Sequence, residues 1–111
     1  MYLGVSPYIV RLASNCRVAP GDTVALPPCR ASVLTIALKV KSSGPVVLMV
    51  DEQGAAGWEE KSREEFLAGD TMWECRLSQP DFRLRLYNPS PVDSVTVNVD
   101  ANLPRRVHTD T

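Results

Sequence analysis

Residues 82–99 read FRLRLYNPSPVDSVTVNV and decide the fold of this chain. Apolar and polar residues alternate on both sides of a turn that contains two prolines, and this is the period of a β-strand rather than of a helix. Antiparallel pairing with Leu86 opposite Val95 would place all the apolar side chains on one face. The side chains of that face are Phe82, Leu84, Leu86, Val95, Val97 and Val99. The stretch therefore predicts a β-hairpin with one buried face.

The rest of the chain repeats this pattern in short segments. Further strands are expected at residues 8–13, 23–26, 33–41, 46–51 and 71–77. Prolines and glycines separate the segments, and 111 residues are enough for one domain with its own core. So many strands do not fit one flat open sheet in a small domain. We therefore expect an all-β fold, an antiparallel two-sheet sandwich of jelly-roll type with about seven strands, over residues 1–103, and an extended C-terminal arm at residues 104–111.

The segment 46–51 departs from the alternating pattern. Pairing with segment 33–41, with Val40 opposite Val47, would keep Val47 on the core face. The opposite face would then be apolar as well, and it would consist of Val46, Leu48 and Val50. A strand that is apolar on both faces is usually covered on both. Either another part of this chain or another molecule should therefore lie over the second face.

Residues 58–68 are the candidate cover for that second face. Their Glu, Lys and Ala content favours about two helical turns that end at Gly69, with Trp58 and Phe66 on one side. The alternative is an irregular, solvated insertion that is anchored by one aromatic side chain. The candidate interface predicted in this way comprises Val46, Leu48, Val50, Trp58 and Phe66.

The charge of the chain is nearly balanced, because 12 basic and 13 acidic residues give a formal net charge of −1. Electrostatic binders of nucleic acid carry a clear basic excess, so a nucleic-acid partner is not expected. Four basic side chains should point outward from the predicted strands: Lys39, Lys41, Arg83 and Arg85. They would form a basic contact stripe if their strands were neighbours. The alternative is ordinary solvation with partial neutralisation by Glu74.

Catalytic motifs are absent from the sequence. There is no G-x-S-x-G, Walker or HExxH motif, and the single histidine, His108, lies in a polar tail that would position a base poorly. A run of carboxylates is typical of a solvated face rather than of a paired acid and base. That run consists of Glu59, Glu60, Glu64 and Glu65. We expect that the protein is not an enzyme.

Metal and sugar sites are weakly indicated. Acidic residues at strand ends could offer oxygen ligands to calcium, but their spacing matches no calcium-binding loop. These residues are Asp22, Asp51, Glu52 and Asp70. Trp58 and Trp73 could form a platform for stacking sugars, but the alternation places Trp73 in the core and leaves Trp58 alone. We therefore expect no metal and no cofactor.

Cysteine usage and hydropathy indicate the compartment. Three cysteines, with no C-x-x-C pair, favour free thiols in a reducing environment, with a Cys16–Cys29 bridge as the alternative. No apolar run approaches the roughly 20 residues that a membrane-spanning helix needs, so membrane insertion is not expected. The first residues lack the basic and apolar regions of a signal peptide. These features predict a location in the cytoplasm or in a virion.

These observations favour an assembly function. We expect a non-enzymatic structural protein, a small subunit that docks onto a larger particle such as a virion capsid or tail through its apolar sheet face and its terminal arms. Its partners would be other protein subunits, in a homo-oligomer or a hetero-oligomer. The alternative is a small module that binds a carbohydrate or another small ligand through residues near Trp58 and the acidic strand ends.

Overall fold

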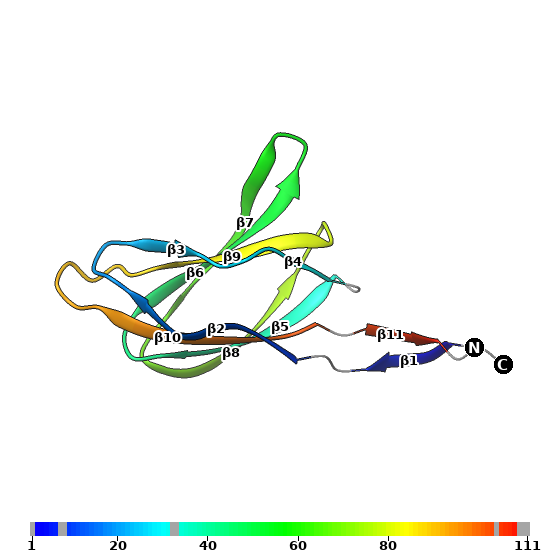
Figure 1. Ribbon diagram of the computed structural model, residues 1–111, viewed down its shortest axis with the longest axis horizontal. Helices are drawn as coiled ribbons and strands as arrows, with labels where there is room; N and C mark the ends of the chain where they lie inside the picture. The colour runs from blue at the N-terminus through cyan, green and yellow to red at the C-terminus, as the bar shows by residue number, and fades with distance from the viewer. Residues whose placement is uncertain (1, 7–8, 32–33, 104, 109–111) are drawn as a thin grey trace.

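The computed structural model describes residues 2–6, 9–31, 34–103 and 105–108, which form strands and no helix. Two antiparallel sheets lie face to face, and a short two-stranded ribbon extends from one end (Figure 1). The strands are β1 (Tyr2–Ser6), β2 (Ile9–Val18), β3 (Thr23–Ala25), β4 (Cys29–Arg30), β5 (Thr35–Ser42), β6 (Val46–Gly54), β7 (Gly57–Phe66), β8 (Gly69–Arg76), β9 (Asp81–Tyr87), β10 (Val95–Asn102) and β11 (Arg105–His108). The predicted all-β, two-sheet class is confirmed.

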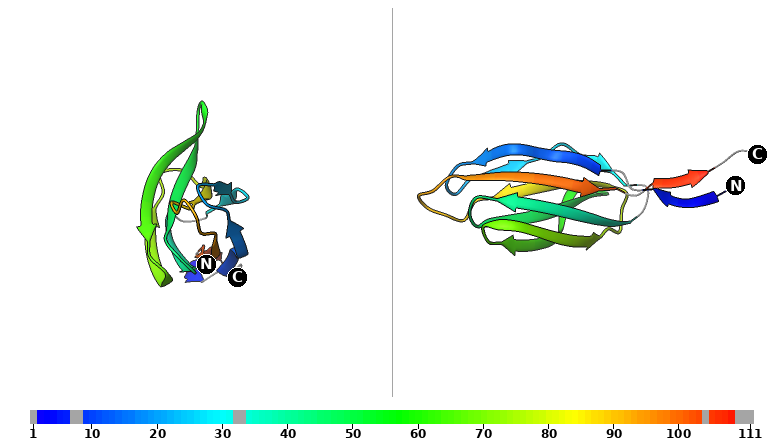
Figure 2. Two further views of the ribbon diagram at one scale, coloured as in Figure 1. Left: turned by 90° about the vertical axis from the view of Figure 1, so that its left-hand side faces the viewer. Right: turned by 90° about the horizontal axis from the view of Figure 1, so that it is seen from below.

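The two sheets are wound together as a jelly roll. A four-stranded sheet has the order β2-β10-β5-β8, and a five-stranded sheet has the order β3-β9-β6-β7, with β4 also paired to β9. Most consecutive strands lie in opposite sheets, so the chain passes repeatedly from one layer to the other (Figure 2). The sheets hold two more strands, β4 and β7, than the seven that alternation predicts.

Strands β9 and β10 do not form the predicted hairpin. Both keep their predicted apolar faces inward, and the side chains of those faces are almost fully buried. However, β9 pairs with β6, whereas β10 pairs with β2 and β5 in the other sheet. The connection at residues 88–94 contains two prolines, which cannot donate ladder hydrogen bonds, and it crosses between the layers. The two apolar faces therefore meet across the core instead of side by side.

Strand β6 has the opposite orientation to the predicted one. Leu48 lies across from Leu86, and Val50 lies across from Leu84, so both share the inward face of β9. Val46, Leu48 and Val50 are at most 1% exposed and belong to the core, which makes their assignment to an intermolecular interface wrong. The reason is the turn at residues 43–45, which carries the chain into the other sheet instead of folding β6 back onto β5.

Residues 57–66 form a β-strand where a helix or an irregular insertion was predicted. Strand β7 pairs along β6, and this hairpin projects beyond the sandwich (Figure 1). Phe66 lies across from Val46, faces the core and meets the ring of Trp73 edge-on at 5.9 Å. Pairing and burial outweigh the helix propensity of the Glu and Lys residues. Phe66 is therefore a core residue, and this segment is not a lid.

The first and last strands of the chain form a separate ribbon. Strand β10 runs on to Asn102, and Leu103 is still buried in the core. Beyond it, β11 pairs antiparallel with β1, with Val5 opposite Arg106. This ribbon lies at one end of the longest dimension of the molecule, which measures 59 Å (Figure 1).

Candidate functional site

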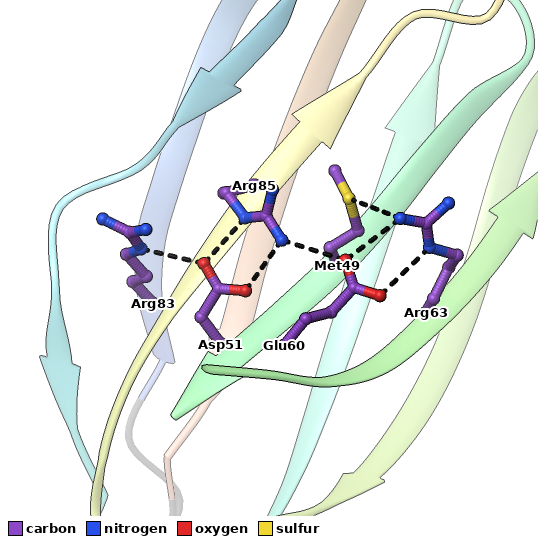
Figure 3. A network of polar contacts seen from close by, with 6 residues as sticks. All are labelled: Met49, Asp51, Glu60, Arg63, Arg83 and Arg85. Atoms are coloured by element: carbon purple, nitrogen blue, oxygen red, sulfur yellow. Dashed lines mark hydrogen bonds and ion pairs between the residues drawn. The ribbon is translucent and has the colours of Figure 1, made fainter. Parts of the chain in front are cut away.

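A charged network covers the outer face of the five-stranded sheet. At its centre is Asp51 of β6, which is only 2% exposed. Arg83 donates to Asp51 from Nε at 2.9 Å, and Arg85 donates from Nε at 2.7 Å and from Nη2 at 2.9 Å (Figure 3). Three donated hydrogen bonds from two cations compensate a carboxylate that would otherwise be costly to bury.

The network continues onto the edge strand β7. Glu60 Oε1 accepts from Arg85 Nη2 at 2.9 Å and from Arg63 Nη2 at 3.0 Å. Arg63 also lies over Met49, with 3.6 Å between its Nη2 and the thioether sulfur (Figure 3). Met49 and Val47 are on the outer face of β6 and are nevertheless buried. Side chains of the flanking strands therefore cover this second apolar face.

The protonation of the network follows from these contacts. Burial by itself would raise the pKa of Asp51, but the hydrogen bonds and charges of Arg85 and Arg83 outweigh burial and lower that pKa. The same contact raises the pKa of Arg85. The hydrogen bond from Arg63 lowers the pKa of Glu60. Asp51, Arg85 and Glu60 are thus charged near neutral pH, and the network acts as an ionic cross-link between β6, β7 and β9.

Trp58 belongs to the same outer face. The guanidinium carbon of Arg83 lies 5.0 Å from the centre of the Trp58 ring, which is a cation–π contact. One face of the ring is therefore occupied by a side chain of this chain. Trp73 is partly buried against the core, as the alternation predicts. The two tryptophans do not form a common platform.

The predicted basic stripe is not continuous. Lys39 and Lys41 lie on β5 in the four-stranded sheet, whereas Arg83 and Arg85 lie on β9 in the five-stranded sheet. These residues point to the opposite outer faces of the sandwich, and both arginines are occupied by Asp51. The premise that the two strands are neighbours is therefore wrong. The two lysines remain as part of a different surface.

That surface is a polar groove of about 400 Å³ on the outer face of the four-stranded sheet. Its lining residues are Arg11, Asn15, Lys39, Lys41, Asp70, Asn98 and Asp100. Arg11 is paired with Asp100, at 2.7 Å from Nε and 3.1 Å from Nη2. The backbone N–H of Asn15 donates to Asn98 Oδ1 at 2.8 Å, at a position where φ is +48° and where Asn is tolerated.

An apolar groove of about 320 Å³ adjoins the polar one. It is lined by Ile9, Ala37, Lys39, Met72, Asp100 and Asn102. Ile9 and Met72 are 63% and 64% exposed, and Lys39 and Asp100 line both grooves. Sequence reasoning missed this surface because its residues come from four strands that are not consecutive. Two large apolar residues on an outward face, Ile9 and Met72, were the feature of the sequence that could have indicated this groove.

Two of the acidic strand ends, Asp51 and Glu52, have structural partners. Asp51 is held by the two arginines, and Glu52 Oε1 accepts from the backbone and side chain of Ser78 and from the backbone of Gln79. No group of three or more His, Cys, Asp or Glu residues in the described ranges is placed to hold a metal ion.

The three cysteines are present as thiols, and burial raises the pKa of Cys29 and Cys75. Within the described part of the chain, no helix is long and apolar enough to cross a membrane.

Comparison with known proteins supports the fold. No protein-family model and no curated protein sequence matches the chain. Among solved structures, the PBSX exported protein XepA is similar with a TM-score of 0.71 and 13% identity, over 94% of this chain and 39% of XepA. PirA is similar with a TM-score of 0.57 and 10% identity, over 82% of this chain and 93% of PirA.

A third similar structure is a de novo designed double-stranded β-helix. Its TM-score is 0.51 at 14% identity, over 85% of this chain and 97% of the design. At such identities the likeness shows the all-β two-sheet fold and nothing of the function. The present chain spans 39% of the length of XepA, so the matching fold is one part of a longer polypeptide there.

Proposed function

We propose that this jelly-roll domain is a non-enzymatic assembly subunit that docks into a larger protein particle through the ribbon of β1 and β11. The observation that carries the proposal is the isolation of this ribbon. Within the described ranges, β1 and β11 pair only with each other and join neither sheet of the sandwich. The outer edge of each strand therefore carries backbone N–H and C=O groups that have no ladder partner.

An isolated two-stranded ribbon is at best marginally stable in water. Open strand edges are also templates for pairing with another chain. Addition of a strand from a neighbouring subunit would satisfy one edge, and a second added strand would satisfy the other; such strand addition is a common mode of recognition between proteins. The ribbon thus replaces the apolar face of β6 as the docking element, because that face is in the core.

Two further observations support an assembly function over the ligand-binding alternative. The fold of this chain matches one part of the longer exported protein XepA, which is compatible with a module that works inside a larger architecture. Jelly rolls form viral capsid domains as well as lectins. The alternative relied on Trp58 as a stacking platform, and Arg83 already stacks on that ring. A particle subunit in the cytoplasm or in a virion is therefore the function that we prefer.

Sedimentation velocity of the full chain tests the proposal, with a second copy as the strand donor. Between about 1 and 100 μM we expect concentration-dependent association. The double variant Val5→Pro with Val107→Pro removes two ribbon N–H groups and should sediment as a monomer, because proline cannot donate to a ladder. Its sandwich should keep the melting temperature of the wild type to within a few degrees, because the core residues are unchanged.

The matched control is Leu67→Ser, an exposed change outside the ribbon, which should associate as the wild type does. Hydrogen exchange should show that the amides of residues 2–6 and 105–108 become protected on association. A wild-type chain that stays monomeric over the whole range, or a proline variant that associates normally, would refute the proposed function.

A further inference from the structure

The two grooves on the four-stranded sheet form one continuous surface with an ordered pattern. Along β5, Ala37 is flanked by Asn102 of β10 and by Glu74 of β8, and Lys39 is flanked by Asp100 of β10 and by Met72 of β8. Lys41 follows, with Asn98 and Asp70 on either side. Successive outward positions on one strand are about 7 Å apart. The outward positions of β5 are therefore apolar at Ala37 and basic at Lys39 and Lys41. Ile9 and Met72 border the apolar end of the groove.

The two lysines are the cations of this surface that are left to bind a partner. The charge of Arg11 is compensated by Asp100. The hydrogen bond and charge of Arg11, together with the charge of Lys39, lower the pKa of Asp100. Of the ion pairs within 4.0 Å in the described ranges, none includes Lys39 or Lys41. The groove thus has a local positive charge, although the chain as a whole has a net charge of −1.

The neighbouring apolar positions restrict the kind of partner. Ile9 and Met72 stay largely exposed in the isolated chain, and both line the apolar end of the groove. A nucleic-acid backbone has no apolar side chain to place between Ile9 and Met72, so it leaves this part of the groove unfilled. A polypeptide fits better because it can present apolar and acidic side chains on one side at the two-residue spacing of the surface.

We propose that this groove binds an extended acidic segment of a partner protein, with an apolar side chain over Ala37 and acidic side chains at the second and fourth following positions, against Lys39 and Lys41. The apolar side chain would fill the space between Ile9 and Met72, and the carboxylates would bind the two ammonium groups. This surface is separate from the β1–β11 ribbon, so the inference does not depend on the proposed assembly function.

Fluorescence anisotropy with a labelled synthetic peptide, Ser-Leu-Ser-Glu-Ser-Glu-Ser, tests this inference on the full chain. We expect binding that weakens as salt is raised. The variant Lys39→Glu with Lys41→Glu should weaken binding about tenfold or more, because it replaces two attractions with two repulsions. Both lysines are exposed, so the fold should be kept, and a thermal melt checks this. The matched control is Lys61→Glu on β7, which should bind within about twofold of the wild type.

Two peptide controls separate specific docking from general attraction of anions. Replacing the Leu by Ser should weaken binding about tenfold, because the apolar end of the groove is left empty. Reversing the charges with Lys in place of both Glu residues should abolish binding. Three outcomes would each overturn the proposal. The Leu and Ser peptides could bind equally, or the Lys39→Glu/Lys41→Glu variant could bind as well as the Lys61→Glu control. The acidic peptide could also fail to bind at about 1 mM.

Discussion

Arg85 reaches diagonally from β9 to Asp51 on β6 and holds that buried carboxylate with two hydrogen bonds, of 2.7 and 2.9 Å. In the ladder, Asp51 is opposite Arg83, and Arg85 is opposite Met49. Both arginines therefore converge on one carboxylate from the same strand. Because Arg85 also binds Glu60, the contact ties β9 through β6 to the edge strand β7. This edge strand has a ladder partner, β6, on one side only.

The Asp51 contact should make stability depend on acid. The folded state holds the pKa of Asp51 below its unfolded value of about 3.9, so the contribution is complete above that value and is lost as pH falls through the lower, folded pKa. Asp51→Asn should cost about 3 kcal/mol at pH 7, because Arg83 loses its anion and Arg85 keeps only Glu60. It should also flatten the fall in stability between pH 7 and pH 3, measured by urea unfolding.

The control for this prediction is Asp81→Asn. Asp81 lies in an exposed pair with Arg30 at 3.2 Å, so its replacement should change stability by less than about 1 kcal/mol. It should also leave most of the acid dependence in place. An Asp51→Asn variant whose stability falls with acid as steeply as that of the wild type would show that this carboxylate is not the responsive group.

The orientation of β6 is tested by Leu48→Ala. Leu48 is fully buried, so the truncation should cost about 3 kcal/mol through lost burial and a residual cavity. Leu67 is the matched control, because it is 78% exposed and Leu67→Ala should stay within about 0.5 kcal/mol of the wild type. Denaturant midpoints report both changes. Equal midpoints for the two variants would place Leu48 outside the core.

Alternation along single strands was sufficient to assign most inward faces. Leu84 and Val97 are buried as predicted, because the side-chain period of a strand is a local property. Strand partners were not predictable in this way. Two strands that pair in one sheet and two strands that face each other across a core show the same alternation. β9 and β10 are of the second kind, and so the predicted hairpin was wrong.

The candidate surfaces were predicted wrongly or not at all for related reasons. The face of β6 depends on whether the turn before Val46 closes a hairpin or crosses between the sheets, and its short polar sequence does not distinguish these cases. Trp58 lies in a segment whose composition favours a helix, but pairing with β6 overrides that preference. The groove around Lys39 is assembled by the order β2-β10-β5-β8, which no local pattern encodes.

Asn88 is expected to be essential for the connection between β9 and β10. It is fully buried, and its Nδ2 donates to Val18 O at 3.1 Å and to Asp93 O at 2.6 Å. Its Oδ1 accepts from the backbone N–H of Ser90 at 2.9 Å. Asn88→Ala would leave these three backbone groups without their partner and should cost about 2 to 3 kcal/mol in urea unfolding.

The control for Asn88 is Asn98→Ala. Asn98 also accepts from a backbone N–H, that of Asn15 at 2.8 Å, but this bond is exposed and water can replace it. We expect a loss of less than about 1 kcal/mol. A similar cost for the two variants would mean that the burial of Asn88 adds nothing to the value of its hydrogen bonds.

Glu52 should hold the turn between β8 and β9 in the same manner. Its Oε1 accepts from Ser78 N at 2.9 Å, from Ser78 Oγ at 2.8 Å and from Gln79 N at 2.7 Å, and the side chain is buried. Glu52→Ala removes the acceptor of these three donors and should cost about 2 to 3 kcal/mol, whereas Glu52→Gln keeps an oxygen there and should cost about half as much. Hydrogen exchange at the two amides should accelerate in the Ala variant.

The control is Glu59→Ala. Glu59 lies across from Glu52 but is half exposed, so this change should leave both the hydrogen exchange and the stability nearly unchanged. An equal effect at Glu59 would contradict this role for Glu52.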